Sequence, residues 1–293
     1  MDDRVIAFIG LGQMGLPMTR RLRGAGFEVR GADLSAAARD AFVADGGQAF
    51  ASPMEAANGS GVLITMLPDA TVVRDALLGA GNAAAALAPG ALVIDMSSSA
   101  PMATRRLGAD LAARGLTLID APVSGGVKRA VVGTLAIMAG GEAAAIERAR
   151  PVLLAMGQSI FSTGPLGSGH AMKALNNYVS AAGLAAACEA LIVGRHFGIA
   201  PETIVDVLNA STGRNNSTEV KLKPFVLSGS FASGFSMALM AKDLRTAADL
   251  AATLGDDVPG IADAAALWEQ AAAALGKGAD HTEIFRFLAE ASA

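Results

Sequence analysis

Apolar residues in the first half of the chain fall into short unbroken runs, separated by longer stretches with helical spacing. Runs that are apolar at every residue are typical of strands covered on both faces, as in a parallel sheet. Strands that alternate with helices predict a doubly wound α/β domain. The predicted strands cover residues 5–9, 29–32, 62–66, 92–96, 116–121, 135–139 and 160–162.

The pattern changes after a linker rich in Ser, Gly and Pro at residues 163–167. Beyond it no strand is predicted, and Gly and Pro residues separate a series of helical segments. We therefore expect an α/β domain at residues 1–164 and an all-helical domain at residues 165–293, built on a long interdomain helix. The predicted helices cover residues 168–197, 201–210, 217–227, 236–254, 259–275 and 281–291.

A glycine motif follows the first predicted strand directly. Gly10, Gly12 and Gly15 have the Gly-x-Gly-x-x-Gly spacing, and a predicted helix begins there. Such a turn lets the backbone approach a pyrophosphate, and the helix N-terminus supplies N–H donors. Asp33 ends the second predicted strand, where a carboxylate accepts hydrogen bonds from a ribose 2′-hydroxyl and repels a 2′-phosphate. The motif predicts a Rossmann domain that binds NAD in preference to NADP; the alternative is a glycine turn without a ligand.

Composition and charge narrow the class of protein. The chain has 293 residues and a formal net charge of −4, without the basic runs that indicate nucleic-acid binding. Its one cysteine, Cys188, excludes an internal disulfide and a site with several thiolate ligands, so we expect no metal centre. The N-terminus lacks the basic region of a signal peptide, and no stretch reaches the roughly 20 strongly apolar residues of a membrane span. We expect a cytoplasmic protein without a membrane or nucleic-acid partner.

Lys173 is the leading candidate for acid/base chemistry. It lies near the start of the predicted helix 168–197, and Asn177 follows one turn later on the same face. A lysine in a partly desolvated cleft has a lowered pKa and can take a proton from a hydroxyl, which an amide side chain can orient. The alternative is a lysine whose stem merely covers apolar surface. We expect His170 to be a cap or packing residue.

Two further segments carry candidate binding residues. Ser124, Gly125 and Gly126 follow a predicted strand, and a hydroxyl with successive glycine N–H groups forms a nest suited to a carboxylate. A plain glycine turn is the alternative. Lys242 lies among apolar residues near the start of a predicted helix, where it is either functional or a lysine that reaches solvent from a buried helix.

Four segments occur in a characteristic order over nearly the whole chain: FIGLGQMGLPM, DAPVSGG followed by GTL, GSGHAMKALNN, and KDL. With them the sequence resembles the β-hydroxyacid dehydrogenase family, which includes dehydrogenases of 3-hydroxyisobutyrate, serine and 6-phosphogluconate and the reductase of tartronate semialdehyde. The resemblance implies that Lys173 is the catalytic lysine and Asn177 its partner, on a helical domain like the C-terminal one of 6-phosphogluconate dehydrogenase. It also implies that the glycine pair before Lys173 starts a helix and is not a phosphate loop.

The resemblance completes the expected site. The expected substrate contacts are Ser124, Gly125, Gly126, Lys173, Asn177, Phe235 and Lys242. The expected cofactor contacts are Gly10, Gly12, Gln13, Met14, Gly15, Asp33, Leu67, Pro68, Ser98 and Lys242.

Departures from the family pattern refine the expected substrate. Asn176 precedes Asn177 where 6-phosphogluconate dehydrogenases, which are longer, carry His-Asn, so a sugar phosphate is disfavoured. Imine reductases of this fold usually lack the lysine. Arg214, Asn215 and Asn216 stand where 3-hydroxyisobutyrate and serine dehydrogenases typically carry a tryptophan, so we expect a more polar pocket.

We therefore expect an oxidoreductase that moves hydride between NAD and a short 3-hydroxy acid such as 3-hydroxyisobutyrate, serine or glycerate. It uses no metal and forms a homodimer or homotetramer. One alternative is a reductase of semialdehydes or glyoxylate that uses NADH or NADPH. A non-catalytic dinucleotide-binding regulator is the distant alternative, because it gives no reason for Lys173, Asn177 and Ser124-Gly125-Gly126 to occur together.

Overall fold

The structure is a computed structural model and describes residues 2–276 and 278–291. Its internal contacts divide the chain into two compact parts, Met1–Lys173 (unit 1) and Ala174–Ala293 (unit 2). The division falls inside helix α8 (Ser168–His196), which begins just after the linker at residues 163–167. The domain limits 1–164 and 165–293 stay predictions.

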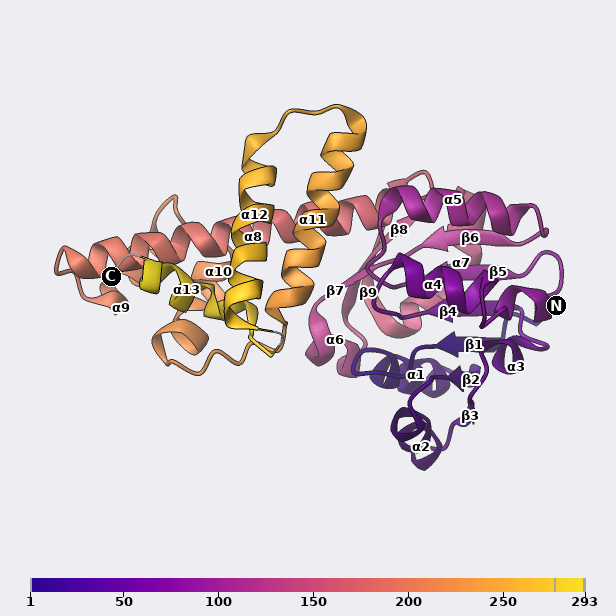
Figure 1. The fold of residues 1–293 in the computed structure, drawn as a ribbon. Coiled ribbons are helices and arrows are strands. Elements are labelled where there is room, and N and C mark those ends of the chain that lie inside the picture. The colour runs from indigo at the N-terminus through magenta and orange to yellow at the C-terminus, as the bar shows by residue number, and fades with distance from the viewer. Residues whose placement is uncertain (1, 277, 292–293) are drawn as a thin grey trace. The chain divides into compact units, whose positions relative to one another are not determined.

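A nine-stranded sheet forms the centre of unit 1 (Figure 1). The strand order is β3-β2-β1-β4-β5-β6-β8-β7, with β9 paired to β8. The first six strands are parallel, whereas β8 pairs antiparallel with β6 and β7. The strands are β1 (Val5–Ile9), β2 (Glu28–Ala32), β3 (Gln48–Phe50), β4 (Val62–Thr65), β5 (Leu92–Asp95), β6 (Thr117–Asp120), β7 (Val123–Ser124), β8 (Leu135–Gly140) and β9 (Gly157–Gly164).

The pairing register brings the carboxyl ends of the parallel strands to one edge. Ile9 lies opposite Ala32 on one side and Thr65 on the other. Thr65 in turn lies opposite Asp95, and Asp95 lies opposite Asp120. The chain order reverses between β1 and β4, and ligands of open α/β sheets bind at this kind of switch point. The loops that follow these strands therefore form the candidate site of unit 1.

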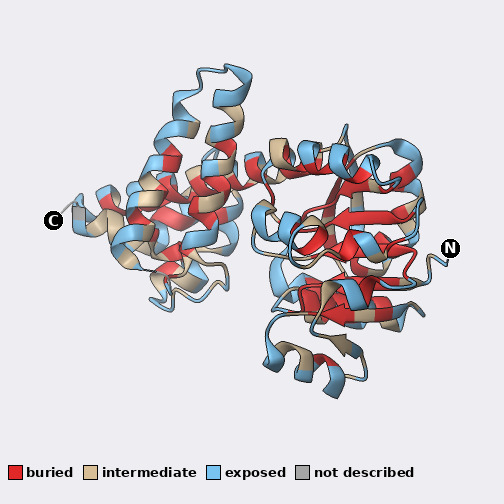
Figure 2. Ribbon diagram, turned by 45° about the vertical axis from the view of Figure 1, so that its right-hand side comes forward, coloured by how far each residue is buried: buried red, intermediate tan, exposed pale blue. Residues whose placement is uncertain are grey.

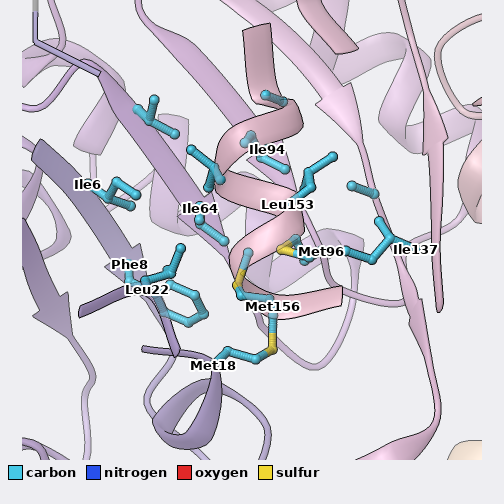
Figure 3. Packing of buried hydrophobic residues seen from close by; sticks show 14 of the residues in the cluster. Ile6, Phe8, Met18, Leu22, Ile64, Ile94, Met96, Ile137, Leu153 and Met156 are labelled. Carbon is cyan, nitrogen blue, oxygen red and sulfur yellow. The ribbon is translucent and has the colours of Figure 1, made fainter. Parts of the chain in front are cut away.

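Helices cover both faces of the sheet. Buried side chains of α1 and α7 pack on one face, where Met18 and Met156 meet strand residues such as Phe8 and Ile94 (Figure 3). Val73 of α4 and Leu107 of α5 belong to a second apolar layer. The helices of unit 1 are α1 (Gly15–Gly24), α2 (Ala36–Ala44), α3 (Pro53–Ala57), α4 (Ala70–Leu78), η1 (Ala83–Ala86), α5 (Pro101–Ala112), α6 (Gly126–Val132) and α7 (Ala143–Met156).

The predicted doubly wound sheet is confirmed, and all seven predicted strands are present within a few residues of their expected bounds. The pattern missed β3 and β7, which are three and two residues long. Neither contains a fully buried residue, so no unbroken apolar run marks them in the sequence.

Unit 2 is all-helical, as predicted. Two predicted helices are divided in the structure. The segment 217–227 forms α10 (Asn216–Val220) followed by the π-helix η2 (Leu222–Leu227), which contains Pro224 and therefore lacks one N–H donor. The segment 281–291 forms the 3₁₀ turn η3 (His281–Glu283) and α13 (Ile284–Ala291). The remaining helices, besides the last part of α8, are α9 (Pro201–Ala210), α11 (Met237–Leu254) and α12 (Pro259–Leu275).

The core of unit 2 is built on small and aliphatic side chains around one large one. Figure 2 shows buried stretches on the inner faces of its helices. Trp268 of α12 is fully buried and stacks on the His281 ring at a centroid distance of 6.4 Å. Among the described residues, its indole N–H has no hydrogen-bond partner. Ala264, Ala265 and Ala271 lie buried on the same helix.

By length and composition, α8 is apolar enough to cross a membrane, which the sequence analysis did not expect. In the structure, 44% of its most apolar window is buried against the rest of the chain. The core helix of a soluble protein meets the same criterion, so α8 alone is weak evidence for a membrane span.

We expect Trp268→Ala to lower the free energy of unfolding by about 3–5 kcal/mol, because it leaves a large cavity in the core of unit 2. Trp268→Phe should cost clearly less, since it keeps most of the ring contacts and removes an N–H that has no partner among the described residues. Urea denaturation followed by far-UV circular dichroism measures both. Equal losses for the two variants would contradict this account.

Candidate active site

The predicted glycine loop has the backbone geometry of a dinucleotide turn. Gly10 has a φ of +104°, and a side chain there would overlap the Met66 carbonyl. A side chain at Gly15 would overlap the Gly10 carbonyl, because α1 starts directly against β1. At Gly12 a Cβ would meet no atom within 4 Å. Two glycines are thus required by the protein itself, and the third borders open space that a pyrophosphate would fill. Gln13 and Met14 complete this turn.

Asp33 follows the end of β2 and holds the same loop. Its Oδ2 accepts a hydrogen bond from the Leu11 N–H at 2.7 Å, and its Oδ1 accepts one from the Ser35 N–H at 2.8 Å. The carboxylate is half-buried, and each oxygen keeps a further lone pair for a ribose hydroxyl. Arg39, which the sequence analysis did not single out, donates to the Asp33 and Leu34 carbonyls.

The loops after β4 and β5 lie side by side at the same edge. The Leu67 N–H donates to Ser97 Oγ at 2.9 Å, and Ser97 precedes the predicted contact Ser98. Pro68 is exposed beside Leu67, and Ser98 is half-buried. The structure therefore brings the predicted contacts Leu67, Pro68 and Ser98 to the sheet edge that carries the glycine loop and Asp33.

Ser124 ends the short strand β7, and the two glycines after it open α6. Gly125 and Gly126 have φ values of +126° and +64°, a region that favours glycine. Both glycines are exposed, and Ser124 is half-buried. The hydroxyl and the two glycine N–H groups are therefore accessible to a ligand.

Lys173 and Asn177 lie one helical turn apart in α8, as predicted. Lys173 is half-buried and Asn177 is buried. The glycine pair before Lys173 serves packing: a side chain at Gly169 would overlap the Met138 carbonyl, and Gly167 has a φ of +89°. The start of α8 therefore lies directly against the sheet, which agrees with a helix start and not with a phosphate loop.

Unit 2 supplies a partner for Asn177 that the sequence analysis missed. The Asn177 amide donates to Asp243 Oδ2 at 2.6 Å, and Lys242 Nζ lies 3.4 Å from Asp243 Oδ1. Asp243 is buried, so its carboxylate orients both side chains. The sequence did contain a signal for Asp243, because this carboxylate follows Lys242 directly in the KDL segment of an otherwise apolar helix.

The other predicted residues of unit 2 have mixed environments. Phe235 is half-buried, and its ring meets the His281 ring edge-on at 5.7 Å. Asn215, expected to make the pocket polar, caps α10: its Oδ1 accepts from the Ser217 and Thr218 N–H groups. Capping thus already occupies this amide oxygen.

Lys221 has a lowered pKa, which the sequence did not indicate. Burial lowers its pKa to about 8, and its Nζ donates to Ser180 Oγ at 3.1 Å.

In the described part of the chain, no group of three or more His, Cys, Asp or Glu side chains is placed to hold a metal ion.

Comparison with known proteins identifies the class. A family model described as the NAD binding domain of 6-phosphogluconate dehydrogenase matches residues 5–164. A second model, NAD-binding of NADP-dependent 3-hydroxyisobutyrate dehydrogenase, matches residues 167–288. The chain belongs to the β-hydroxyacid dehydrogenase family and is an oxidoreductase with NAD as its cofactor.

Individual relatives span most of the chain. The 2-(hydroxymethyl)glutarate dehydrogenase of Eubacterium barkeri is 40% identical over 83% of this chain and 80% of its own. The NAD-dependent L-serine dehydrogenase of Pseudomonas aeruginosa is 38% identical over 87% of each chain. A solved structure of Mycobacterium tuberculosis 3-hydroxyisobutyrate dehydrogenase with L-serine superimposes with a TM-score of 0.90, at 37% identity, over 97% of this chain and 98% of that one.

Gly12→Ala should weaken NAD binding by about tenfold or more, because the added methyl occupies the space of the pyrophosphate. The folded protein has room for it, so the melting temperature should not change. Gly24→Ala, at an exposed and unobstructed glycine at the end of α1, is the matched control and should bind NAD like the wild type. Calorimetric titration and thermal melting measure both; equal NAD affinities in the two variants would contradict the assignment.

Asp243→Asn should lower kcat/KM by roughly 10–100-fold, because the new NH2 must face either the Asn177 amide donor or the Lys242 ammonium. Asp249→Asn, an exposed position on the same helix, should leave steady-state rates unchanged. Wild-type rates in both variants would show that Asp243 does not orient the site.

Proposed function

We propose that the protein oxidises short acids that carry a primary hydroxyl on the carbon next to the α-carbon. The observation that carries this proposal is the pair Lys173 and Asn177, one turn apart on α8, with the Asn177 amide held by a buried Asp243. A binding protein without turnover has no need of an amine base with an oriented amide beside it.

The named relatives narrow the substrate class. 2-(Hydroxymethyl)glutarate, L-serine and 3-hydroxyisobutyrate share one unit, a carboxylate and a hydroxymethyl group on the same α-carbon. Recognition of this unit needs an anion site for the carboxylate and a base at the hydroxyl, whose carbon is two carbon–carbon bonds from the carboxylate carbon. We assign the carboxylate to Ser124, Gly125 and Gly126, whose hydroxyl and N–H groups are accessible and uncharged.

The acid/base step belongs to Lys173. In its neutral form, its amine takes the proton of the substrate hydroxyl, and the alcohol carbon becomes an aldehyde. When bound, NAD would supply the acceptor for the hydride that leaves this carbon. Asn177 donates to the hydroxyl oxygen or accepts from it, Lys242 stabilises developing negative charge, and Phe235 provides an apolar wall. In the reverse direction the Lys173 ammonium protonates the forming alkoxide.

The cofactor role falls to the carboxyl edge of unit 1. The N–H groups and open space of the Gly10–Gly15 turn receive the pyrophosphate, and the Asp33 carboxylate accepts from the ribose hydroxyls. Because a 2′-phosphate would meet this carboxylate, NAD is favoured over NADP. Leu67, Pro68 and Ser98 line the same edge.

We further propose a cytoplasmic homodimer or homotetramer that binds neither membranes nor nucleic acids. Exposed apolar side chains on and just after α8, Val179, Val193 and Phe197, support subunit contacts through unit 2.

The first test follows nicotinamide absorbance with NAD and NADP over a panel of acids: 3-hydroxyisobutyrate, serine, glycerate, threonate and 2-(hydroxymethyl)glutarate, with the corresponding carbonyl compounds in reverse. We expect turnover with NAD for a member that carries the shared unit. Lys173→Ala should lower kcat by roughly 10²–10⁴-fold. Lys223→Ala, an exposed lysine paired with Asp206, is the matched control. Unchanged kcat in Lys173→Ala would refute the assigned base.

A further inference from the structure

A buried carboxylate ties the first turn of α8 to the sheet. Asp120, the last residue of β6, has no exposed surface. Its Oδ1 accepts a hydrogen bond from the Gly167 N–H and its Oδ2 accepts one from the His170 N–H, both at 2.7 Å. Burial raises the pKa of this carboxyl, and the His170 ring and these two donors oppose that rise. The N–H groups at a helix start, which otherwise lack partners, are thus satisfied by a strand residue.

The His170 side chain makes a second tie, to a different part of unit 1. Its Nε2 donates to the Ser97 carbonyl at 3.2 Å, because a carbonyl oxygen can only accept. Its Nδ1 pairs with Thr104 Oγ1 of α5 at 2.8 Å. The side chain of His170 is fully buried and lies between two carboxylates, with Asp95 Oδ2 and Asp120 Oδ2 each 3.7 Å from a ring nitrogen.

The backbone packs closely around these hydrogen bonds, so the groups that form them have little room to move. A Cβ at Gly140 would lie 2.6 Å from Asp120 Oδ1 and 2.7 Å from Ser168 Oγ. Ser168 Oγ is also 2.8 Å from Thr163 Oγ1. The first turn of α8 is therefore held on several sides by groups that cannot move independently.

Lys173 follows His170 by three residues, within the next turn of a continuous helix. The rotation and tilt of that helix start consequently set the direction of the Lys173 side chain. Ser97, which accepts from His170 through its carbonyl, also accepts from the Leu67 N–H through its hydroxyl. The same loop thus contacts both the helix that carries the base and the predicted cofactor edge.

We propose that His170 and Asp120 are positioning residues that hold Lys173 in register with the cofactor edge of unit 1. This inference rests on the proposed role of Lys173 as the acid/base. Neither residue touches the substrate; each acts through the helix start. A base displaced by about 1 Å loses roughly 10²-fold in rate, so small shifts of this turn have large effects.

The test compares four variants. His170→Phe keeps a planar ring but removes both nitrogens, and His170→Gln restores an N–H donor. Thr104→Val removes the hydroxyl that pairs with Nδ1. Thr19→Val is its matched control, since Thr19 is also fully buried and donates to a carbonyl of its own helix at 2.7 Å. Thr19 lies on α1, and the ring nitrogens of His170 pair with Thr104 and Ser97 instead.

We expect kcat to fall roughly 10²-fold in His170→Phe, with NAD affinity unchanged, and to recover in part in His170→Gln. Thr104→Val should show a smaller fall and Thr19→Val none. With substrate deuterated at the alcohol carbon, the isotope effect on kcat should rise in His170→Phe, because a misplaced base makes the chemical step rate-limiting. The limb of the kcat–pH profile set by the base should also move.

A readout without turnover separates this inference from the proposed function. Reductive ¹³C-methylation labels the lysines, and Lys173→Arg identifies the Lys173 resonance. That resonance should shift in His170→Phe and Thr104→Val but not in Thr19→Val, while the exposed Lys223 resonance stays in place in all of them.

If Lys173→Ala keeps full activity, the proposed base is wrong, whatever the His170 variants do. If Lys173→Ala is inactive but His170→Phe and Thr104→Val leave kcat, the isotope effect and the Lys173 resonance unchanged, the positioning role is refuted. A loss of melting temperature without these changes would mark His170 as structural only, and would equally overturn the inference.

Discussion

Two buried carboxylates at the carboxyl edge of the sheet are the constraint on which the rest of the site depends. Asp95 and Asp120 end neighbouring strands in register, and both are almost fully buried. A buried carboxylate is costly unless hydrogen-bond donors surround it. The donors here come from elsewhere in the chain: Thr65, Ser97 and Ser99 to Asp95, and the first turn of α8 to Asp120. The hydrogen bonds to these two carboxyl groups hold the loops and the helix of the candidate site together.

The same principle operates in unit 2 on a smaller scale. Asp243 is buried in α11 and meets the Asn177 amide and the Lys242 ammonium. One buried carboxylate thus contacts Asn177 and Lys242, and another holds the start of the helix that carries Lys173. Groups of this kind lie one shell behind the proposed reacting side chains, and in binding sites they orient the residues in front of them.

Glycines complete this arrangement by steric means. Gly10 and Gly15 allow the nucleotide loop to close, while Gly140 and Gly169 allow α8 to reach the sheet edge. Of the two glycine motifs, the first borders open space for a ligand at Gly12, and the second is filled by protein. The two motifs have similar glycine spacing in the sequence, but only the first has open space beside one of its glycines.

The sequence by itself determined the architecture and identified most of the candidate site residues. Apolar runs marked seven of the nine strands, and five of these, β1, β4, β5, β6 and β8, are buried over most of their length. The linker at 163–167 marked the change to helices. Spacing alone paired Lys173 with Asn177 and placed Gly10 and Asp33 at strand ends. Only the tertiary structure decided how these residues are held. Asp120, His170 and Thr104 lie far apart in sequence, and so do Asn177 and Asp243. Such contacts follow from strand register and helix packing, which depend on the whole core and leave no local periodicity to read.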